Sequence, residues 1–328
     1  MALRLELEER VPDGIRRILD EALAEMESTL GSESVKNGRA VHKTRRGCKR
    51  IRALLRMVRS DLGTTWAFEN RWYRDLSRSL SSARDADVCV ATLDRLQKRY
   101  EGLVRPKTFK VAGSHLRRSR AEGRPTLGRV RSAAADEVRK ARARVDQLPL
   151  STDNFELVSL GLAVTHRRGA QLFRRARKTG KPECFHDLRK RVKYLNYQVG
   201  VLEASAPLLI PALTSELATL GDVLGDAQDL DLLRGFLAEM RPSQELEVIR
   251  ALAVEWESLL HREALDRGRS VFGRETGAFI EDLEVHWVLW KGLDLESRGL
   301  VVPAARLLRA GGRREERKAG GRQKSPSA

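Results

Sequence analysis

Two short patterns recur in this chain with the same separation, and this internal repeat restricts the possible folds more than any other feature. The tetrapeptide HKTR that begins at His42 returns 144 residues later as HDLR at His186, and a lysine follows each histidine by seven residues. An Asp-x-Asp pattern follows each tetrapeptide at the same distance, at Asp85 and at Asp229. Two patterns in one register are much stronger evidence than one, so we expect a chain of two similar halves.

Apolar residues are spaced for helices along nearly the whole chain. From Ile15 to Leu30 they recur three or four positions apart, which places them on one helical face. No series of alternating apolar and polar residues predicts a sheet. We therefore expect an all-α fold of two pseudo-symmetric four-helix bundles. After residues 15–30, helices are expected over 34–60, 65–99 (one long helix or a pair), 130–147, 154–177, 183–205, 207–240 and 243–270, with a loop or broken helix over 113–128.

The two halves are expected to be separated by the turn-rich segment LPLSTD at residues 148–153. The first half would cover about residues 10–148 and the second about residues 152–305. Residues 311–328 consist mainly of Gly, Arg, Lys, Glu and Ser, which predicts a disordered basic tail.

The net charge of +17 indicates a polyanionic partner such as nucleic acid, an anionic membrane or polyphosphate. Most of this charge lies in two stretches, with +10 between residues 105 and 145 and +5 from residue 309 onward. Either stretch could bind polyanions non-specifically. The remaining chain carries only +2, so a specific site there must depend on how charges are arranged.

Several classes of protein are disfavoured by the composition. The three cysteines are far apart in the sequence, which argues against a disulfide scaffold and a cysteine-rich zinc site. No apolar run is long enough for a transmembrane helix, and the first residues lack the apolar core of a signal peptide. The few, widely spaced cysteines suit a reducing compartment, so we expect a cytoplasmic protein. We expect no cofactor and no metal site, because no metal-binding histidine pattern or phosphate-binding glycine loop occurs.

Each tetrapeptide begins a stripe of basic residues at helical spacing. Residues 42–60 contain no Asp or Glu, and like charges on one helical face repel each other. An anionic ligand would relieve this repulsion, whereas a solvated face, a structural ion-pair network and packed structural histidines are the alternatives. The candidate binding residues are His42, Arg45, Arg46, Lys49, Arg52 and Arg56 in the first copy and His186, Arg189, Lys190, Lys193 and Tyr197 in the second.

The Asp-x-Asp patterns supply candidate partners for these cations. Asp87 and Asp231 each end an apolar stripe that would share one helical face, from Leu76 in the first copy and from Leu220 in the second. An aspartate in this position is partly buried and needs a charged partner, so we expect both to anchor Arg or His side chains. Arg84 could join the basic surface.

The segments VHKTRRGCKRIRALLRMVRSDLG and FHDLRKRVKYLNYQVGVLE, followed by SSARDADV and GDAQDLDLL, resemble the two halves of a CHAD domain, a histidine-containing α-helical family. The resemblance covers about residues 10–305. It implies that inorganic polyphosphate binds along a basic surface between the halves, lined by His42, Arg45, Lys49, Arg52, His186, Arg189 and Lys193. Asn196 stands where the first copy has Arg52, which makes the second half poorer in charge.

The resemblance favours a stand-alone binding module, because the triphosphate-tunnel domain that often accompanies this family is not found here. Polyphosphate has no bases, so its binder needs Lys and Arg donors rather than stacking platforms. Binding of RNA or another nucleic acid stays open because Tyr194 and Tyr197 lie among the cations. A metal-dependent phosphotransfer or phosphohydrolase enzyme that uses the Asp-x-Asp pairs is the other alternative. Accumulation at polyphosphate granules in the cytoplasm would follow from the first function.

Overall fold

The computed structural model describes residues 3–80, 85–122 and 127–293, and within them the chain is all-α, as expected. No strand occurs in these ranges. The helices are α1 (Val11–Gly31), α2 (Asn37–Met57), α3 (Arg59–Leu62), α4 (Thr65–Ser79), α5 (Asp85–Arg99), α6 (Lys110–Glu122), α7 (Leu127–Arg142), α8 (Glu156–Thr179), α9 (Pro182–Gly200), α10 (Leu209–Ala238), α11 (Gln244–Phe272) and α12 (Thr276–Trp290).

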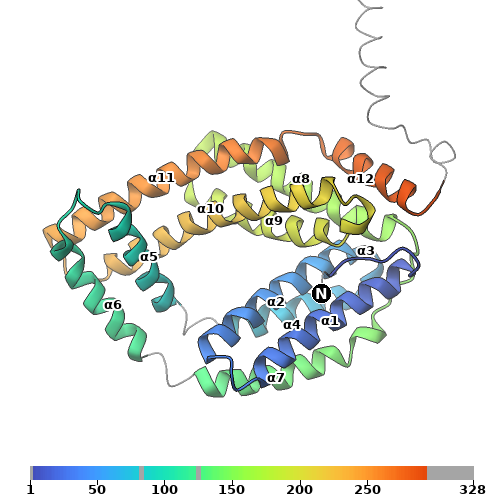
Figure 1. Ribbon diagram of the computed structural model, residues 1–328, viewed down its shortest axis with the longest axis horizontal. Coiled ribbons are helices and arrows are strands. Elements are labelled where there is room, and N and C mark those ends of the chain that lie inside the picture. The colour runs from blue at the N-terminus through green and yellow to red at the C-terminus, as the bar shows by residue number, and fades with distance from the viewer. Residues whose placement is uncertain (1–2, 81–84, 123–126, 294–328) are drawn as a thin grey trace, which may run out of the picture.

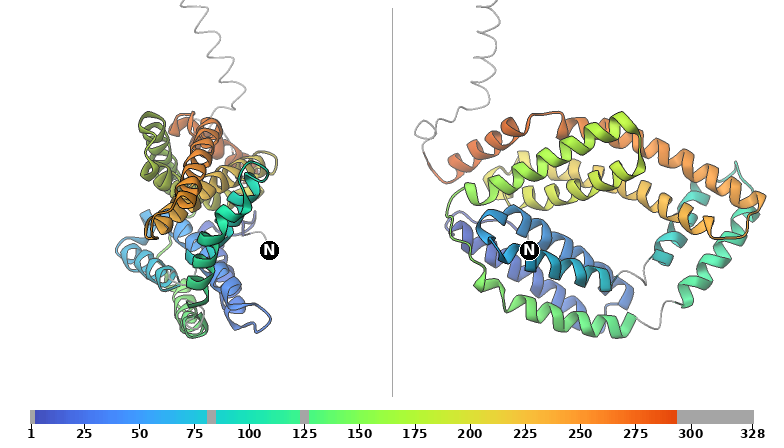
Figure 2. Two further views of the ribbon diagram at one scale, coloured as in Figure 1. Left: turned by 90° about the vertical axis from the view of Figure 1, so that its left-hand side faces the viewer. Right: turned by 180° about the vertical axis from the view of Figure 1, so that it is seen from behind.

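The helices form two packed groups that lie one above the other in Figure 1. Helices α1, α2, α4 and α7 pack together in the lower group, and α8, α9, α10 and α11 pack together in the upper group. Helix α2 packs against α9, and this contact joins the two groups at their centre. Helices α5 and α6 stand at one end, where α5 packs against α10 (Figure 2).

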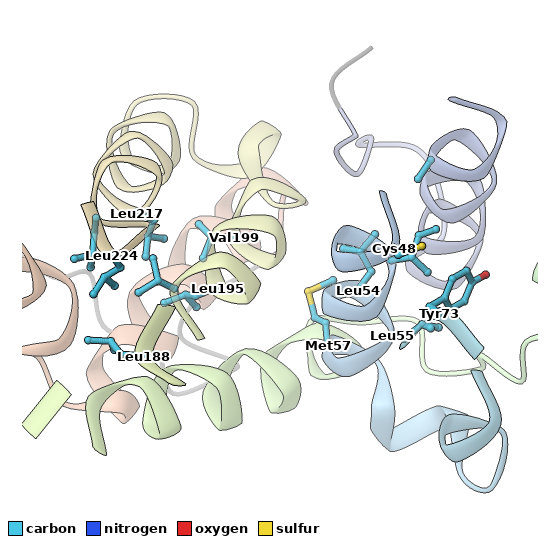
Figure 3. Close-up of a cluster of buried hydrophobic side chains, with 14 of the residues drawn as sticks. Cys48, Leu54, Leu55, Met57, Tyr73, Leu188, Leu195, Val199, Leu217 and Leu224 are labelled. Carbon is cyan, nitrogen blue, oxygen red and sulfur yellow. The ribbon is translucent and has the colours of Figure 1, made fainter. Parts of the chain in front are cut away.

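The apolar faces of the central helices make the core. Figure 3 shows Cys48, Leu54 and Met57 of α2 on one side and Leu188 and Leu195 of α9 on the other. Burial raises the pKa of Cys48 to about 12, which keeps its thiol protonated at neutral pH. Because the apolar face of each helix points into its own group, the basic residues of α2 and α9 are left on half-buried or exposed faces.

The two groups also meet directly through backbone contacts. Gly161 of α8 lies against Met57, where an added Cβ atom would come within 2.1 Å of the Met57 carbonyl oxygen. At the α2–α9 crossing, the side chain of Gln198 donates a buried hydrogen bond of 2.8 Å to the carbonyl oxygen of Ala53. These contacts fix the relative position of the two basic helices.

The stretch 65–99 is a helix pair, so the expectation that Leu76 and Asp87 share one helical face is wrong, and only α10 carries the corresponding stripe unbroken. The serine hydroxyl of Ser79 donates to the Leu76 carbonyl oxygen, a local bond that competes with helix continuation. Helix α6 begins at Lys110 and includes Gly113, in a stretch expected to be a loop or a broken helix.

Helix α12 lies beyond the last helix that the sequence pattern predicted. It is apolar around most of its circumference, with Phe279, Leu283 and Trp287 buried, so it lacks the one-sided pattern used to predict helices. The predicted tail, residues 311–328, lies outside the described residues.

Candidate anion-binding surface on helices α2, α4, α9 and α10

Helix α2 is unusual because it contains eight Lys and Arg residues and no Asp or Glu. Its apolar side chains, among them Val41, Ile51 and Leu55, are buried and fix the orientation of the helix. The histidine and lysine of the first pattern, His42 and Lys49, are exposed, whereas the arginines Arg45, Arg52 and Arg56 are half-buried.

The half-buried arginines of α2 point toward α4. The Nη1 atom of Arg45 donates to the carbonyl oxygen of Leu80, at 3.4 Å. Arg52 and Arg56 both donate to the side-chain oxygen of Asn70, at 3.2 and 3.3 Å. Burial lowers the pKa of Arg56, and the positive charge of Arg52 lowers it further. A single neutral amide oxygen therefore holds two guanidinium groups side by side.

In the second copy, the cations of α9 cross the surface of α10. Arg189 donates to Gln228 at 2.6 Å, and Lys193 donates to Asp222 at 2.9 Å. Two glycines of α10 make room for these side chains. A Cβ atom at Gly225 would lie 2.8 Å from the Arg189 Nη2 atom, and one at Gly221 would lie 2.8 Å from the Lys193 side chain.

The histidine of the second repeated pattern, His186, lies 3.6 Å from a carboxylate oxygen of Asp231. Behind it, His261 of α11 stacks on Phe185 with ring centroids 3.7 Å apart. Burial, together with the nearby His186, lowers the pKa of His261 to about 4. His186 is half-buried, whereas His261 lies deeper and stays neutral at physiological pH.

Three other candidate residues lie away from the α4 and α10 faces. Arg46 is exposed beside a hollow of about 280 Å³ between α1 and α2, which Glu25 also lines. Lys190 pairs with Asp187 of its own helix at 2.8 Å. Tyr197 lies under the guanidinium group of Arg50, 5.8 Å from it, at the crossing of α2 and α9.

One further candidate lies in α5. Asp87 is half-buried near the N-terminal end of this helix. Arg84 lies outside the described residues.

Several residues of this surface were not predicted as part of it. No sequence pattern identifies these residues one by one, although each lies on the long helix that follows a basic stripe. They are Asn70 of α4 and Gly221, Asp222 and Gly225 of α10. Arg95 of α5 reaches across to α10 and binds carboxylates of Asp226 at 2.5 Å and Asp229 at 3.3 Å.

Six cations of the basic stretch 105–145 are engaged within the protein, which reduces the capacity of this stretch for non-specific binding. Arg144 forms two hydrogen bonds with the buried Glu69, at 2.7 and 3.1 Å. Arg131 donates to the backbone carbonyl oxygens of Leu30 and Val35. Further cations of this stretch pair with carboxylates: Arg117 with Asp94, Arg139 with Asp136, Lys140 with Glu137, and Arg142 with Asp20 and Glu27.

Within the described residues, no group of three or more His, Cys, Asp or Glu side chains could hold a metal ion. Within the same residues, no helix combines the length and the apolar character that crossing a membrane requires.

The fold and its basic surface can be compared with known proteins. No curated protein matches the chain. Among solved structures, the chain is similar to the crystal structure of the CHAD domain from the plant Ricinus communis, with a TM-score of 0.55 and 18% sequence identity over 84% of this chain and 96% of that one. This likeness shows a shared fold. The family model of the CHAD domain matches residues 17–238, which is more than half of the chain. The chain therefore belongs to the CHAD domain family.

Proposed function

We propose that this protein binds inorganic polyphosphate, without catalysis, along the surface formed by α2, α4, α9 and α10. The observation that carries the proposal is the pairing of Arg52 and Arg56. Both donate to the neutral oxygen of Asn70, and in the part of the chain that the structure describes neither forms an ion pair with a carboxylate. Two adjacent guanidinium groups that share a neutral acceptor provide the charge-assisted donors that a phosphate oxygen requires.

The positions of the helices support two repeated halves that present one surface. Helix α8 begins 145 residues after α1, at Glu156 against Val11, and α10 begins 144 residues after α4, at Leu209 against Thr65. The same shift relates α2 to α9. We infer that the two packed groups are pseudo-symmetric four-helix bundles, whose basic helices α2 and α9 lie against each other at the centre.

A phosphate polymer fits this surface better than a nucleic acid does. The rings nearest the end of the α2 stripe, Trp66 and Tyr194, both already contact guanidinium groups, with Arg56 at 5.1 Å from one and 5.0 Å from the other. Rings that are covered in this way are poor platforms for bases, whose stacking provides much of the affinity for single strands. Nucleic acid remains the second candidate because Tyr197 also lies near the cations.

The Asp-x-Asp residues of the second half contact cations, which supports a binding role. Asp229 binds Arg95, and Asp231 faces His186. Carboxylates that are engaged in this way position the side chains of the basic surface. The competing function, a metal-dependent phosphohydrolase, requires the same acids to bind metal instead.

The test is to replace Arg45, Lys49, Arg189 and Lys193 together with alanine and to titrate polyphosphate calorimetrically. A variant that lacks three tail charges, Lys318, Arg322 and Lys324, is the control. If arranged donors matter, the first variant loses far more affinity than the ratio of charges removed predicts. If both variants lose polyphosphate affinity in proportion to the number of charges removed, the polymer is held only by non-specific electrostatic attraction.

Three further measurements separate the alternatives. Affinity for polyphosphate is expected to fall with rising salt, because cation–phosphate contacts release counterions. RNA at matched charge is expected to compete weakly, and strong competition would favour the nucleic-acid function. Turnover of polyphosphate when divalent metal is added would show an enzyme.

A further inference from the structure

The C-terminal half of α8 carries a second basic face that the surface described above does not include. No Asp or Glu occurs between residues 157 and 182. In the described part of the chain, none of the cations in this segment forms an ion pair. All of them are exposed: Arg167, Arg168, Arg174, Arg175, Arg177, Lys178 and Lys181.

The lack of acids is shared with α2, whereas other basic helices of the protein carry acids among their cations. Exposed cations elsewhere commonly pair with an acid one turn away, as Arg139 does with Asp136 and Lys190 with Asp187. Such pairs stabilise a helix by a few tenths of a kcal/mol, and like charges at the same spacing destabilise it by a similar amount. The basic face of α8 is therefore mildly unfavourable in isolation, and a bound polyanion would relieve its repulsion.

The cations of this face are lined up along the helix. Arg167, Arg174 and Lys178 occupy positions i, i+7 and i+11, which share one helical face. At 1.5 Å per residue they extend over about 16 Å. This spacing suits a linear polyanion that contacts the helix at intervals of one to two turns.

A chain of cations and aromatic rings connects this face with the α2 stripe. The guanidinium group of Arg191 lies 5.8 Å from the ring of Tyr194, and that of Arg56 lies 5.0 Å from the same ring. On the other side, Trp66 is contacted by Arg56 at 5.1 Å and by Arg59 at 5.2 Å. These residues come from α2, α3, α4 and α9, so the chain lies where the two groups of helices meet.

Stacking against a ring occupies the flat face of a guanidinium group and leaves its N–H edge for other partners. In the described residues, the side chain of Arg191 has no hydrogen bond and no ion pair, and its Nε atom is a buried donor without an acceptor. Burial lowers the pKa of Arg191, and the charge of Arg168 on α8 lowers it further. Arg191 therefore links the aromatic contacts at the junction to the basic face of α8.

We propose that the polyphosphate path continues from the α2 stripe over Arg56 and Arg191 onto the exposed basic face of α8, which forms a second binding segment. This inference rests on the proposed function. A phosphate polymer is favoured over a single-stranded nucleic acid because Trp66 and Tyr194 are each contacted by two guanidinium groups, which leaves little ring surface for bases. Short phosphate chains would fill one segment, and long chains would cover both.

The test replaces Arg167, Arg174 and Lys178 with alanine, which is favourable in helices, and checks helicity by circular dichroism. The control replaces three exposed cations outside this face, Lys107, Lys110 and Arg241. Both variants and the native chain are titrated with tripolyphosphate and with long-chain polyphosphate. We expect the α8 variant to lose about ten-fold or more in affinity for the long chain, because phosphate contacts are removed, and to bind tripolyphosphate unchanged.

The other outcomes overturn the inference in distinguishable ways. Equal losses in the α8 variant and the control would show that only net charge matters. Unchanged long-chain affinity in the α8 variant, with native binding intact, would refute the second segment and leave the proposed function standing. If the native chain binds neither polymer, both proposals fail.

A lipid surface is the competing partner for this face. Leu160 and Val164 are exposed beside the cations, as in helices that lie on anionic membranes. Vesicles that contain phosphatidylserine provide the control. Vesicle binding that the three substitutions abolish, with polyphosphate binding unchanged, would assign the face to lipid and overturn the inference.

Discussion

Gly225 of α10 leaves the space that the guanidinium group of Arg189 occupies. A Cβ atom at position 225 would lie 2.8 Å from the Nη2 atom and 3.3 Å from the central carbon of that group. The contact involves the far end of a flexible side chain rather than backbone, so the arginine can move aside. The glycine therefore determines where the charge lies, while the fold does not depend on it.

The first prediction is that Gly225→Ala separates stability from binding. Alanine in a helix interior is more favourable than glycine by about 1 kcal/mol, so the free energy of unfolding is expected to rise or stay constant. The displaced Arg189 loses its bond to Gln228, and polyphosphate affinity is expected to fall several-fold. Urea denaturation and calorimetric titration measure the two effects.

Gly235 provides the matched control for this substitution. It lies on the same helix, and an added Cβ atom would meet nothing within 4 Å. Gly235→Ala is expected to give the same gain in stability with unchanged affinity. If both variants bind polyphosphate as the native protein does, the position of Arg189 is unimportant for binding.

The second prediction concerns Arg144, which follows α7 and binds Glu69 of α4. Its partner Glu69 has a side chain only 4% exposed, and the guanidinium group also lies 4.3 Å from the ring of Trp72. Arg144→Ala leaves a buried carboxylate without its partner, which is expected to cost about 3–5 kcal/mol of stability. Chemical denaturation measures this loss.

A neighbouring arginine tests whether burial is the cause. Arg142 pairs with Asp20, but both side chains are 41% exposed. Arg142→Ala is expected to cost at most about 1 kcal/mol, because surface ion pairs contribute little. Similar losses in the two variants would contradict burial of the Glu69 carboxylate as the cause of the larger loss.

Much of this fold is predictable from the sequence for two reasons. Helical spacing depends on residues that are close together in the chain, and the repeated patterns indicate corresponding helices twice. The apolar stripe from Ile15 to Leu30 and the paired histidine patterns each predict a helix in a known register. Arg189 and Lys193, one turn apart on α9, both contact α10, as their spacing on one helical face predicts.

Features that depend on contacts between distant segments are not predictable in this way. A glycine such as Gly221 gives no sign in the sequence of which side chain it accommodates. Arg131 is bound to backbone carbonyl oxygens nearly 100 residues away, so counting its charge overestimates the basic surface. Helix α12 could not be predicted from the sequence pattern, because a helix that is buried on most sides has no polar face and therefore shows no helical periodicity.

The third prediction is a loss of stability at acidic pH caused by His261. Its pKa in the folded protein is about 4, below the value of about 6.5 for an unfolded chain. The unfolded state therefore binds the proton more readily, and stability falls as the pH drops from about 6.5 to about 4. One such group contributes at most about 1.4 kcal/mol per pH unit in this window.

Phenylalanine preserves the stacking on Phe185 and cannot be protonated. His261→Phe is expected to be less sensitive to acid than the native protein, as measured by urea midpoints at pH 7 and pH 5. His115 is exposed, and His115→Gln serves as the control that leaves the acid sensitivity unchanged. An unaltered difference between the two pH values in His261→Phe would exclude this histidine as the cause.

The fourth prediction is an increase in polyphosphate affinity, a result that unfolding of the variant could not produce. Asp222 holds the amino group of Lys193 at 2.9 Å while its own side chain is 78% exposed, and Arg78 stands at the corresponding place in the first copy. Asp222→Asn removes a negative charge from the binding surface and releases Lys193 for a phosphate oxygen. We expect affinity for polyphosphate to rise several-fold and to become more sensitive to salt.

The same change of charge on α11 tests whether position matters. Asp266 is 71% exposed and pairs with Arg269 at 3.6 Å, so Asp266→Asn removes an equally accessible negative charge from another helix. Only Asp222→Asn is expected to increase affinity markedly, since repulsion of the polymer by a more distant surface carboxylate is screened over about 10 Å at 0.1 M salt. Equal gains would show that the polymer responds to net charge alone, and a loss in Asp222→Asn would mean that the carboxylate orients Lys193 for binding.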